Sequence, residues 1–513
     1  MKTNGVMILD FGSQYTKLIA RRVREENIYS EIFPYNISID EIEKSNPTAI
    51  ILSGGPSSVF ADGALKINPE ILKYNVPILG ICYGLQLLVH SFGGDVQTKK
   101  SGEYGLSKIF VDSSHKIFSN IPKEIDTWMS HMDQVTKIPS NWKILAKSSN
   151  EIIGAVSNED STRIGLQFHP EVIHTEYGKE ILRNFLVKIA KCKTDWNANN
   201  YVREQIIKIK EKVGDDKLII GVSGGVDSTV AAALIHKSIG DQSTAVLIDH
   251  GLMRKNEAEK CVAALKKGLG VNIHCFNESE IFLSKLEGKK DPEEKRKIIG
   301  NQFIKSFEKI SKKFGDIKFL AQGTLYPDVI ESGFGVGGKS HTIKSHHNVG
   351  GLPENMNFKL IEPLRDLFKD EVRKVGIELG LPPKLVQRHP FPGPGLGVRI
   401  IGKITKERVR ILQEADKIFI DILHDDNLYD DIWQAFAVLI PIKTVGVMGD
   451  KRTYENLLAL RAVTSVDGMT ADWFKIPDST LAKASRRIVN NVKYVNRVVY
   501  DITSKPPGTI EWE

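Results

Sequence analysis

At 513 residues the chain is too long for a single hydrophobic core, and its length predicts about three domains. Its hydrophobic content of 41% and charged content of 26% are typical of a soluble globular protein and exclude a disordered or collagen-like chain. The formal net charge of +7 is spread along the chain. A clustered basic stripe is missing, which argues against nucleic acid as a partner and favours sites for small phosphate-bearing molecules.

The sequence also argues against export and membrane insertion. Asp10 interrupts the apolar stretch near the N-terminus, and no apolar run approaches the roughly 20 residues of a membrane span. None of the cysteines forms a CxxC pair, which argues against a disulfide framework or a zinc ribbon; they are Cys82, Cys192, Cys261 and Cys275. We therefore expect a cytoplasmic protein.

The first 190 residues alternate short apolar runs with helical stretches. This alternation predicts an α/β domain with a mostly parallel sheet covered by helices. The segment 191–200 is polar and lacks periodicity, so we expect the first domain to span residues 1–195. Its predicted buried strands are Val6–Leu9, Ala49–Leu52, Pro77–Ile81 and Ile164–Phe168.

A second α/β domain is expected over residues 196–390. It begins with a predicted helix, Tyr201–Val213. The segment Arg388–Gly395 contains three prolines and cannot form a regular element, so it marks the second boundary. The predicted strands are Leu218–Val222, Thr244–Ile248 and Lys318–Ala321.

The remaining residues, 391–513, predict a smaller α+β domain. Predicted helices cover Lys406–Leu423 and Thr480–Val492, and predicted strands cover Val398–Ile401 and Val495–Ile502. No internal repeat or low-complexity tract is visible.

The first candidate site is the motif Gly80-Ile81-Cys82-Tyr83-Gly84, which follows a predicted strand. Flanking glycines permit a sharp strand-to-helix turn that exposes a nucleophile, and the helix N-terminus favours the thiolate. The Tyr83 N–H can donate to an oxyanion, and Gly55 in the loop Ser53–Pro56 can supply a second donor. The motif predicts Cys82 as a catalytic nucleophile.

His169 and Glu171 follow another predicted strand and complete a candidate triad. His169 can take the thiol proton, and Glu171 can hold the imidazole tautomer. A lone buried cysteine or turn histidine is more often structural, but the three features together favour catalysis.

The segments GICYGLQ and QFHPEV resemble the triad (type-1) glutamine amidotransferases. This resemblance implies a thioester at Cys82, release of glutamate and free ammonia. Relatives often carry glycine where this chain has Met132.

The second candidate site is the segment Ser223–Thr229, which lies between a predicted strand and an alanine-rich helix. Its small residues and the helix N-terminus suit a phosphate group. Asp227 would repel phosphate unless it shared Mg²⁺ or oriented the loop, so its presence suggests a metal site with Asp227 as a ligand. The alternative is an ordinary glycine turn with a helix cap. The segment resembles the PP-loop of ATP pyrophosphatases, which implies ATP binding and AMP transfer by Ser223, Gly224, Gly225, Val226, Asp227, Ser228 and Thr229.

A second glycine-rich segment, Gly333–Ser340, matches the Walker A pattern letter for letter. A Walker A loop requires a buried strand before it and a helix after it. Neither is predicted here, so we interpret the match as coincidence and the segment as a mobile loop, a candidate lid over the nucleotide.

A triad amidotransferase followed by a PP-loop resembles the GMP synthetase family, in its shorter bacterial form. Asparagine synthetases would need an N-terminal cysteine, glutamine-dependent NAD synthetases use a different triad, and tRNA-thiolating PP-loop enzymes usually bring paired cysteines. The supporting segments are long and specific: Gly323–Ser332, Lys344–Pro353, Arg388–Arg399, Val445–Asp450 and Lys505–Glu513.

The resemblance implies that XMP, ATP, glutamine and water give GMP, AMP, pyrophosphate and glutamate through an adenyl-XMP intermediate. It also implies a homodimer formed by the C-terminal domain and an XMP site made of Gln434, Asp450, Arg461, Lys505, Thr509, Ile510 and Glu511. Two alternatives stay open. One is a PP-loop RNA-modifying enzyme with an amidase domain. The other is a non-enzymatic binding protein whose triad has lost its catalytic role.

Overall fold

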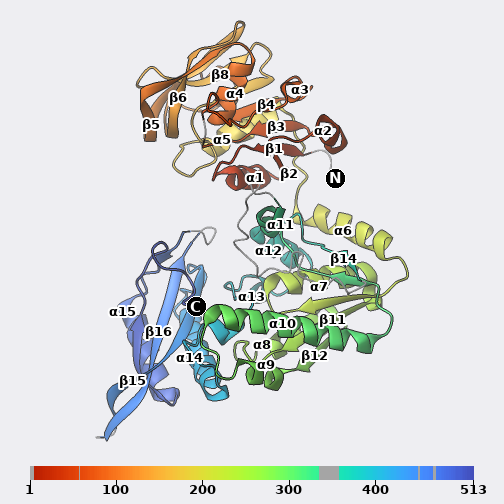
Figure 1. Ribbon diagram of the computed structural model, residues 1–513, viewed down its shortest axis with the longest axis vertical. Helices are drawn as coiled ribbons and strands as arrows, with labels where there is room; N and C mark the ends of the chain where they lie inside the picture. Colours follow the sequence, from red (N-terminus) through yellow and green to blue (C-terminus); the bar gives the residue numbers. More distant parts are fainter. Residues whose placement is uncertain (1–4, 57, 334–357, 449–450, 466–469) are drawn as a thin grey trace. The chain divides into compact units, whose positions relative to one another are not determined.

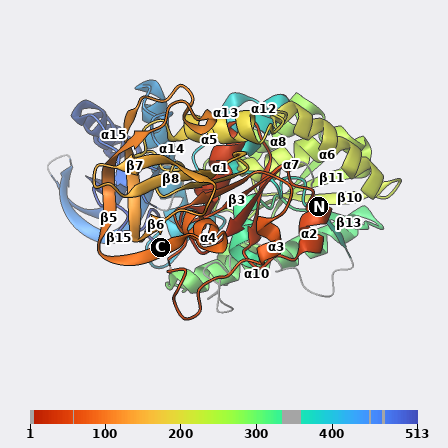
Figure 2. The same ribbon diagram turned by 90° about the horizontal axis from the view of Figure 1, so that it is seen from above.

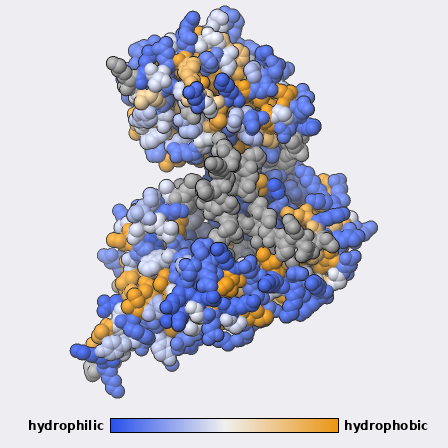
Figure 3. Space-filling view, viewed as in Figure 1, coloured by the Kyte–Doolittle hydropathy of each residue, from blue (hydrophilic) through white to orange (hydrophobic). Residues whose placement is uncertain are grey.

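The computed structural model describes residues 5–56, 58–333, 358–448, 451–465 and 470–513. The described residues up to Asn200 form one compact unit, and the residues from Tyr201 onward form most of a second (Figure 1). No helix among the residues that the structure describes is long and apolar enough to cross a membrane. Figure 3 shows a face that is mostly hydrophilic, with apolar residues in small groups.

The first unit is built on a nine-stranded sheet with the order β2-β1-β3-β4-β9-β8-β7-β5-β6. Its first five strands are parallel, and the short apolar runs that form them are buried because helices cover the sheet. These strands are β1 (Val6–Asp10), β2 (Ser30–Pro34), β3 (Ala49–Leu52), β4 (Ile78–Ile81) and β9 (Arg163–Leu166). The helices are α1 (Thr16–Glu25), α2 (Ile39–Ser45), α3 (Pro69–Leu72), α4 (Tyr83–Ser91) and α5 (Gly178–Arg183).

The other half of this sheet is antiparallel, which the sequence analysis did not predict. Its strands are β5 (Asp95–Val111), β6 (Glu124–Lys137), β7 (Trp142–Ser148) and β8 (Ile153–Asn158). The long pair β5 and β6 lies at one edge of the sheet in both views (Figures 1 and 2). The sheet is therefore α/β as predicted, but parallel only in part.

The second unit contains a five-stranded parallel sheet with the order β12-β11-β10-β13-β14. Its strands are β10 (Leu218–Val222), β11 (Ser243–Asp249), β12 (Ile273–Asn277), β13 (Phe319–Ala321) and β14 (Lys359–Ile361). The helices are α6 (Ala198–Val213), α7 (Val226–Ile239), α8 (Glu257–Ala263), α9 (Ser279–Leu286), α10 (Pro292–Ser311), α11 (Tyr326–Gly333), α12 (Lys369–Glu378) and α13 (Pro383–Val386). Strand β10 is central, and the chain crosses from one side of it to the other.

The C-terminal residues of this unit form a four-stranded sheet with two helices against it. A long antiparallel hairpin, β15 and β16, dominates the sheet (Figure 1). The elements are α14 (Lys406–Asp425), β15 (Gln434–Met448), β16 (Lys451–Thr464), β17 (Asp472–Trp473), α15 (Asp478–Asn491) and β18 (Val495–Tyr500).

The two sheets of the second unit share one hydrophobic core. Ile219 and Val246 of the parallel sheet belong to the same buried cluster as Leu412 and Phe419 of α14 and Leu458 of β16. A separate domain over residues 391–513 therefore stays a prediction.

The predicted strand Val398–Ile401 is wrong. Residues Gly395–Val398 form a 3-10 turn, and only Ile400 makes a bridge, to Leu439. Gly395 has φ +62°, and a Cβ there would lie 2.3 Å from the Leu252 carbonyl oxygen. The close approach at Gly395 belongs to the turn before this run, and the run itself joins β15 only through that one bridge.

Candidate active sites

Cys82 stands at a sharp turn between β4 and α4. Its backbone has φ 52° and ψ −103°, a conformation that L-residues seldom adopt, and its side chain is buried. A Cβ at Gly80 would lie 2.4 Å from the backbone of Gly84, and a Cβ at Gly84 would lie 2.5 Å from the Leu52 carbonyl oxygen. Both glycines are therefore required by contact, and the turn presents the thiol at the carboxyl edge of the sheet.

His169 and Glu171 form a buried pair beside this turn. The His169 Nδ1 and the Glu171 Oε1 are 2.8 Å apart, and both side chains are almost completely enclosed. Burial alone would lower the pKa of His169, but the carboxylate of Glu171 and a hydrogen bond with Cys82 outweigh it and raise that pKa well above its ordinary value. The raised pKa favours the imidazolium form of His169 beside the Cys82 sulfur.

Two further residues, which the sequence analysis missed, fix the His169 ring and backbone. Thr175 Oγ1 donates to the His169 carbonyl at 2.6 Å and accepts from the Trp128 N–H at 3.0 Å. The ring of Tyr15 meets the imidazole edge-on, with centroids 5.1 Å apart. Tyr15 lies more than 150 residues away in the chain, so no local pattern could have linked it to His169.

The glycine loop after β3 lies beside both the nucleophile turn and the histidine. A Cβ at Gly54 would lie 3.2 Å from His169 Cε1, and one at Gly55 would lie 3.2 Å from Tyr83 Cγ. The structure therefore brings Gly55 and Tyr83 together. Their role as oxyanion donors stays a prediction.

A segment of β6 lies against the other side of the thiol. Cys82 Sγ donates to the Ser130 carbonyl, and Gln167 Nε2 donates to Cys82 Sγ, both at 3.7 Å. Gln86 on α4 holds this strand through a 2.9 Å bond to the Asp133 carbonyl. Met132, where relatives often have glycine, is 42% exposed and so does not fill this wall.

In the second unit, the predicted phosphate loop joins β10 to α7. Gly224 has φ +78°, which glycine adopts without strain. Ser228 Oγ accepts from the Ser223 N–H at 3.1 Å, and Thr229 Oγ1 donates to the Gly225 carbonyl at 2.7 Å. These bonds hold the loop around the N-terminus of α7, where backbone N–H groups favour an anion.

The loop opens into a cavity of about 340 Å³ at the carboxyl ends of β10 and β13. This is the point where the chain crosses from one side of the sheet to the other, the usual ligand site of such sheets. A Cβ at Gly323, after β13, would lie 3.3 Å from the Ser228 nitrogen, so the two loops meet. Phe303, Ile304 and Phe307 of α10 supply an apolar wall.

Two basic residues that the sequence analysis did not select lie at this cavity. Lys369 at the start of α12 binds both carboxylate oxygens of Asp227. Arg388 donates to the Gly224 carbonyl at 2.8 Å and pairs with the buried Glu257. Arg388 lies in a segment that the family resemblance had singled out, whereas Lys369 carries no local signal.

The Walker-like segment lies almost wholly outside the described residues. Its first residue, Gly333, ends α11, so a helix and not a strand precedes the match. The interpretation of the match as a coincidence stays a prediction for the rest of the segment.

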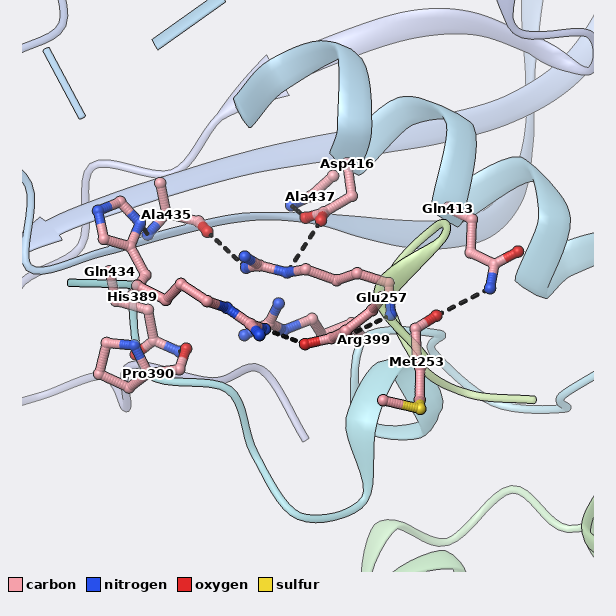
Figure 4. A network of polar contacts seen from close by, with 12 residues as sticks. Met253, Glu257, His389, Pro390, Arg399, Gln413, Asp416, Gln434, Ala435 and Ala437 are labelled. Atoms are coloured by element: carbon pink, nitrogen blue, oxygen red, sulfur yellow. Dashed lines mark hydrogen bonds and ion pairs between the residues drawn. The ribbon is translucent and has the colours of Figure 1, made fainter. Parts of the chain in front are cut away.

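A third polar cluster contains Gln434 and Glu511, both predicted to bind the acceptor nucleotide. Glu511 accepts two bonds from Arg399, at 2.8 and 3.0 Å, and one from Gln434 Nε2 at 2.7 Å. The Arg399 guanidinium is completely buried and lies over the ring of Phe436, 4.1 Å from its centroid. Figure 4 shows Arg399 and Gln434 in one polar network with His389 and Pro390.

The other predicted acceptor residues lie along the C-terminal tail or face it. Arg461 is buried on β16 and donates to the carbonyls of Thr503, Thr509 and Ile510. Ile510 packs in an apolar cluster with Phe436, and the Lys505 backbone pairs with Ala471. The structure thus uses Arg461 to hold the tail, and Asp450 lies outside the described residues.

Comparisons with known proteins match the whole chain. Residues 7–189 match the class-I glutamine amidotransferase family, residues 198–305 the NAD synthase family, and residues 421–512 the GMP synthase C terminal domain. The chain is 54% identical to a glutamine-hydrolysing GMP synthase of Carboxydothermus hydrogenoformans, over 99% of each chain. Its identity to the proteins of the same name from Thermosipho melanesiensis and Chlorobaculum tepidum is 55%, over 99–100% of each chain. The chain therefore belongs to the family of glutamine-hydrolysing GMP synthases.

Proposed function

We propose that the protein converts XMP, ATP, glutamine and water to GMP, AMP, pyrophosphate and glutamate. The observation that carries the proposal is the presence, in one chain, of a buried Cys82–His169–Glu171 constellation and of a separate phosphate-loop cavity around Asp227. The first suits hydrolysis of an amide, and the second suits cleavage of ATP between its α and β phosphates.

In the first unit, the Cys82 thiolate attacks the glutamine side-chain carbonyl. The N–H groups of Tyr83 and Gly55 stabilise the oxyanion of the tetrahedral intermediate. His169, held by Glu171, gives its proton to the leaving nitrogen, which departs as ammonia. Water activated by His169 then hydrolyses the thioester, and glutamate leaves with Cys82 restored.

In the second unit, the loop Ser223–Thr229 binds the β and γ phosphates of ATP. The 2-oxygen of XMP attacks the α phosphorus, and pyrophosphate leaves while the loop holds it. Ammonia then adds to C2 of the adenyl-XMP intermediate and expels AMP. The basic residues Lys369 and Arg388 are placed to balance the charge of the departing pyrophosphate.

We propose Mg²⁺ as the metal cofactor of this step. Proteins commonly hold Mg²⁺ through one or two carboxylates together with substrate phosphates. Asp227 and Asp328 both line the cavity, so the residues present fit that mode of binding. The ion would supply positive charge to the phosphate oxygens, and Lys369 supplies positive charge at Asp227.

For the acceptor, we propose that Glu511 and Gln434 contact XMP, together with Lys505, Thr509 and Ile510 of the tail. Glu511 is partly exposed, and Arg399 holds its carboxylate in one orientation through two parallel bonds. Arg461 acts through the tail carbonyls that it binds, and Asp450 is retained from the family resemblance alone.

We further propose a cytoplasmic homodimer that assembles through the C-terminal sheet. The hairpin β15–β16 carries exposed apolar side chains at Val445, Val447 and Tyr454, where a second copy could cover them. We retain three functional domains, over residues 1–195, 196–390 and 391–513.

The test is an assay of GMP formation from XMP and ATP, with either glutamine or ammonium as nitrogen source. AMP and pyrophosphate should form in equal amounts with GMP, and Mg²⁺ should be required. When XMP carries heavy oxygen at position 2, the label should appear in AMP. ADP with labelled inorganic phosphate would instead overturn the assignment of the phosphate loop, and RNA-stimulated ATP turnover would favour an RNA-modifying enzyme.

A further inference from the structure

The last residues of the tail bind two fully buried cations. Glu511 binds Arg399, and Glu513 binds Lys295, and neither cation has any exposed surface. Trp512 between them is 37% exposed and donates to Asp501 instead. The two glutamates therefore anchor the tail, whereas the tryptophan does not.

Lys295 lies in the first turn of α10 and depends on the tail for its charge. Its ammonium donates to the Ile400 carbonyl at 2.9 Å and to the Glu513 carboxylate. A buried ammonium is stable only with an anionic partner, and Glu513 is the partner that forms an ion pair with it. Burial lowers the pKa of Lys295, and Glu513 opposes that shift.

Glu513 also joins three segments that are far apart in the sequence. Its side-chain carboxylate accepts from the Gly402 N–H at 3.1 Å, and its backbone oxygen accepts from Arg296 Nη2 on α10 at 2.6 Å. Residues Arg399 to Gly402 thus lie between the two anchors, with Arg399 on Glu511 and Gly402 on Glu513. The position of Glu511 relative to α10 is set by this framework.

Helix α10 reaches the nucleotide cavity with its middle turns. Phe303, Ile304 and Phe307 line the cavity two to three turns after Lys295. A rigid helix transmits a displacement of its first turn to these side chains. The pair of Glu513 and Lys295 therefore connects the tail that carries Glu511 with the wall of the cavity.

We propose that Glu513 is a positioning residue for adenylyl transfer: by pairing with Lys295 it fixes the acceptor-binding tail relative to the α10 wall of the ATP cavity. The inference rests on the proposed function, in which Glu511 holds XMP and the cavity holds ATP. In-line attack needs the two substrates aligned within a fraction of an ångström, and a misplacement of about 1 Å can cost on the order of 100-fold in rate.

The first experiment compares Glu513→Gln with Trp512→Phe in the full-length enzyme, with ammonium as nitrogen source. Glu513→Gln should lower kcat for GMP formation at least about tenfold and leave KM for ATP within about twofold. Exchange of labelled pyrophosphate into ATP in the presence of XMP should fall in parallel. Trp512→Phe should behave as wild type. Wild-type kinetics in Glu513→Gln would overturn the inference, whereas failure of the wild type to form GMP would overturn the proposed function.

A second variant separates positioning from stability, because Glu513→Gln leaves a buried charge unpaired. In Lys295→Met/Glu513→Gln both charges are gone, and such replacements are often neutral for stability. Its Tm should return to within a few degrees of wild type while kcat stays low. Recovery of wild-type kcat together with Tm would show that the pair only stabilises the fold, and the inference would fail.

Discussion

Lys369 binds both carboxylate oxygens of Asp227, at 2.6 and 2.5 Å, although 142 residues separate them in the chain. Asp227 lies in the first turn of α7, where the helix dipole also stabilises a negative charge. The contact places an ammonium group in the nucleotide cavity, beside the loop that binds phosphate.

Replacing Asp227 with asparagine should lower synthesis from ammonium and from glutamine by the same factor. Loss of a charge-assisted bond costs about 1.5–3 kcal/mol, which corresponds to roughly a 10- to 100-fold decrease. Lys369→Met should have a similar effect. Asp241→Asn, which is exposed in the 3-10 turn that follows α7, serves as the matched control. Normal ammonium-driven turnover in Asp227→Asn would show that Asp227 has no role in the ATP site.

Cys82→Ala should separate the two activities. Without the thiol, glutamine-supported GMP synthesis should fall by on the order of 10³-fold or more. Synthesis from ammonium should be retained, because the phosphate loop belongs to the other unit. Both activities are measured on the same preparation. Their joint loss in a folded variant would contradict the assignment of the thiol.

The pH dependence of glutamine hydrolysis should report the pair of His169 and Glu171. The raised pKa of His169 keeps the imidazolium, so activity is lost as pH rises through that pKa. Glu171→Gln removes the carboxylate that raises the pKa, and the alkaline limb of the profile should move to lower pH. The pKa of His169 is higher in the folded protein than in the unfolded chain. The pair of His169 and Glu171 therefore stabilises the fold fully below about pH 6.5, and this stabilisation is lost as the pH rises through the pKa of the folded protein. If the alkaline limb of the Glu171→Gln profile does not move, a group other than His169 controls the loss of activity at high pH.

The nucleophile turn should tolerate no side chain at Gly84. A Cβ there would lie 2.5 Å from the Leu52 carbonyl oxygen, and overpacking of this kind costs about 1–3 kcal/mol. Gly84→Ala should therefore lower Tm and abolish glutamine hydrolysis. Gly154→Ala on β8 is a suitable control, because its nearest neighbour would be at 3.6 Å. Equal thermal stability of the two variants would show that the turn can relax.

Lys505→Ala and Glu511→Ala should weaken the use of XMP. Each change removes a charged contact worth about 1.5–3 kcal/mol, so KM for XMP should rise roughly 10- to 100-fold. Glutamine hydrolysis without XMP should stay near normal. Lys493→Ala, on the exposed turn before β18, is the control. Unchanged KM for XMP in both tail variants would show that XMP binds outside the C-terminal tail.

Local chemistry explains why the sequence pointed to both candidate sites. A nucleophile such as Cys82 needs small neighbours within two residues, and a phosphate loop such as Ser223–Thr229 needs glycines and hydroxyls in one short run. Such constraints are visible over seven residues. The strand β10 and the helix α14 were equally predictable, because a short continuous apolar run marks the strand and a repeat of apolar residues on one face marks the helix.

Contacts between distant segments were not predictable in this way. Lys369 and Tyr15 reach their partners only after the sheets form, and nothing near them in the chain marks them. The hairpin of β15 and β16 was missed although it is long, because its end has no buried face: Lys451 to Glu455 are exposed or half-buried, and the apolar Val445 and Val447 opposite them are exposed too. Conversely, the run Val398–Ile401 suggested a strand, but its first residue ends a 3-10 turn and only Ile400 forms a bridge, to Leu439.

The backbone of Cys82 has a thermodynamic consequence of its own. A non-glycine residue at φ 52° and ψ −103° costs on the order of 1–3 kcal/mol, and the surrounding structure must supply this energy. The bonds from the Cys82 N–H to Leu166 and from the Gln86 N–H to the Cys82 carbonyl hold the residue there. The free-energy cost of orienting the Cys82 sulfur is thus offset when the chain folds, and binding of each glutamine does not have to supply it again.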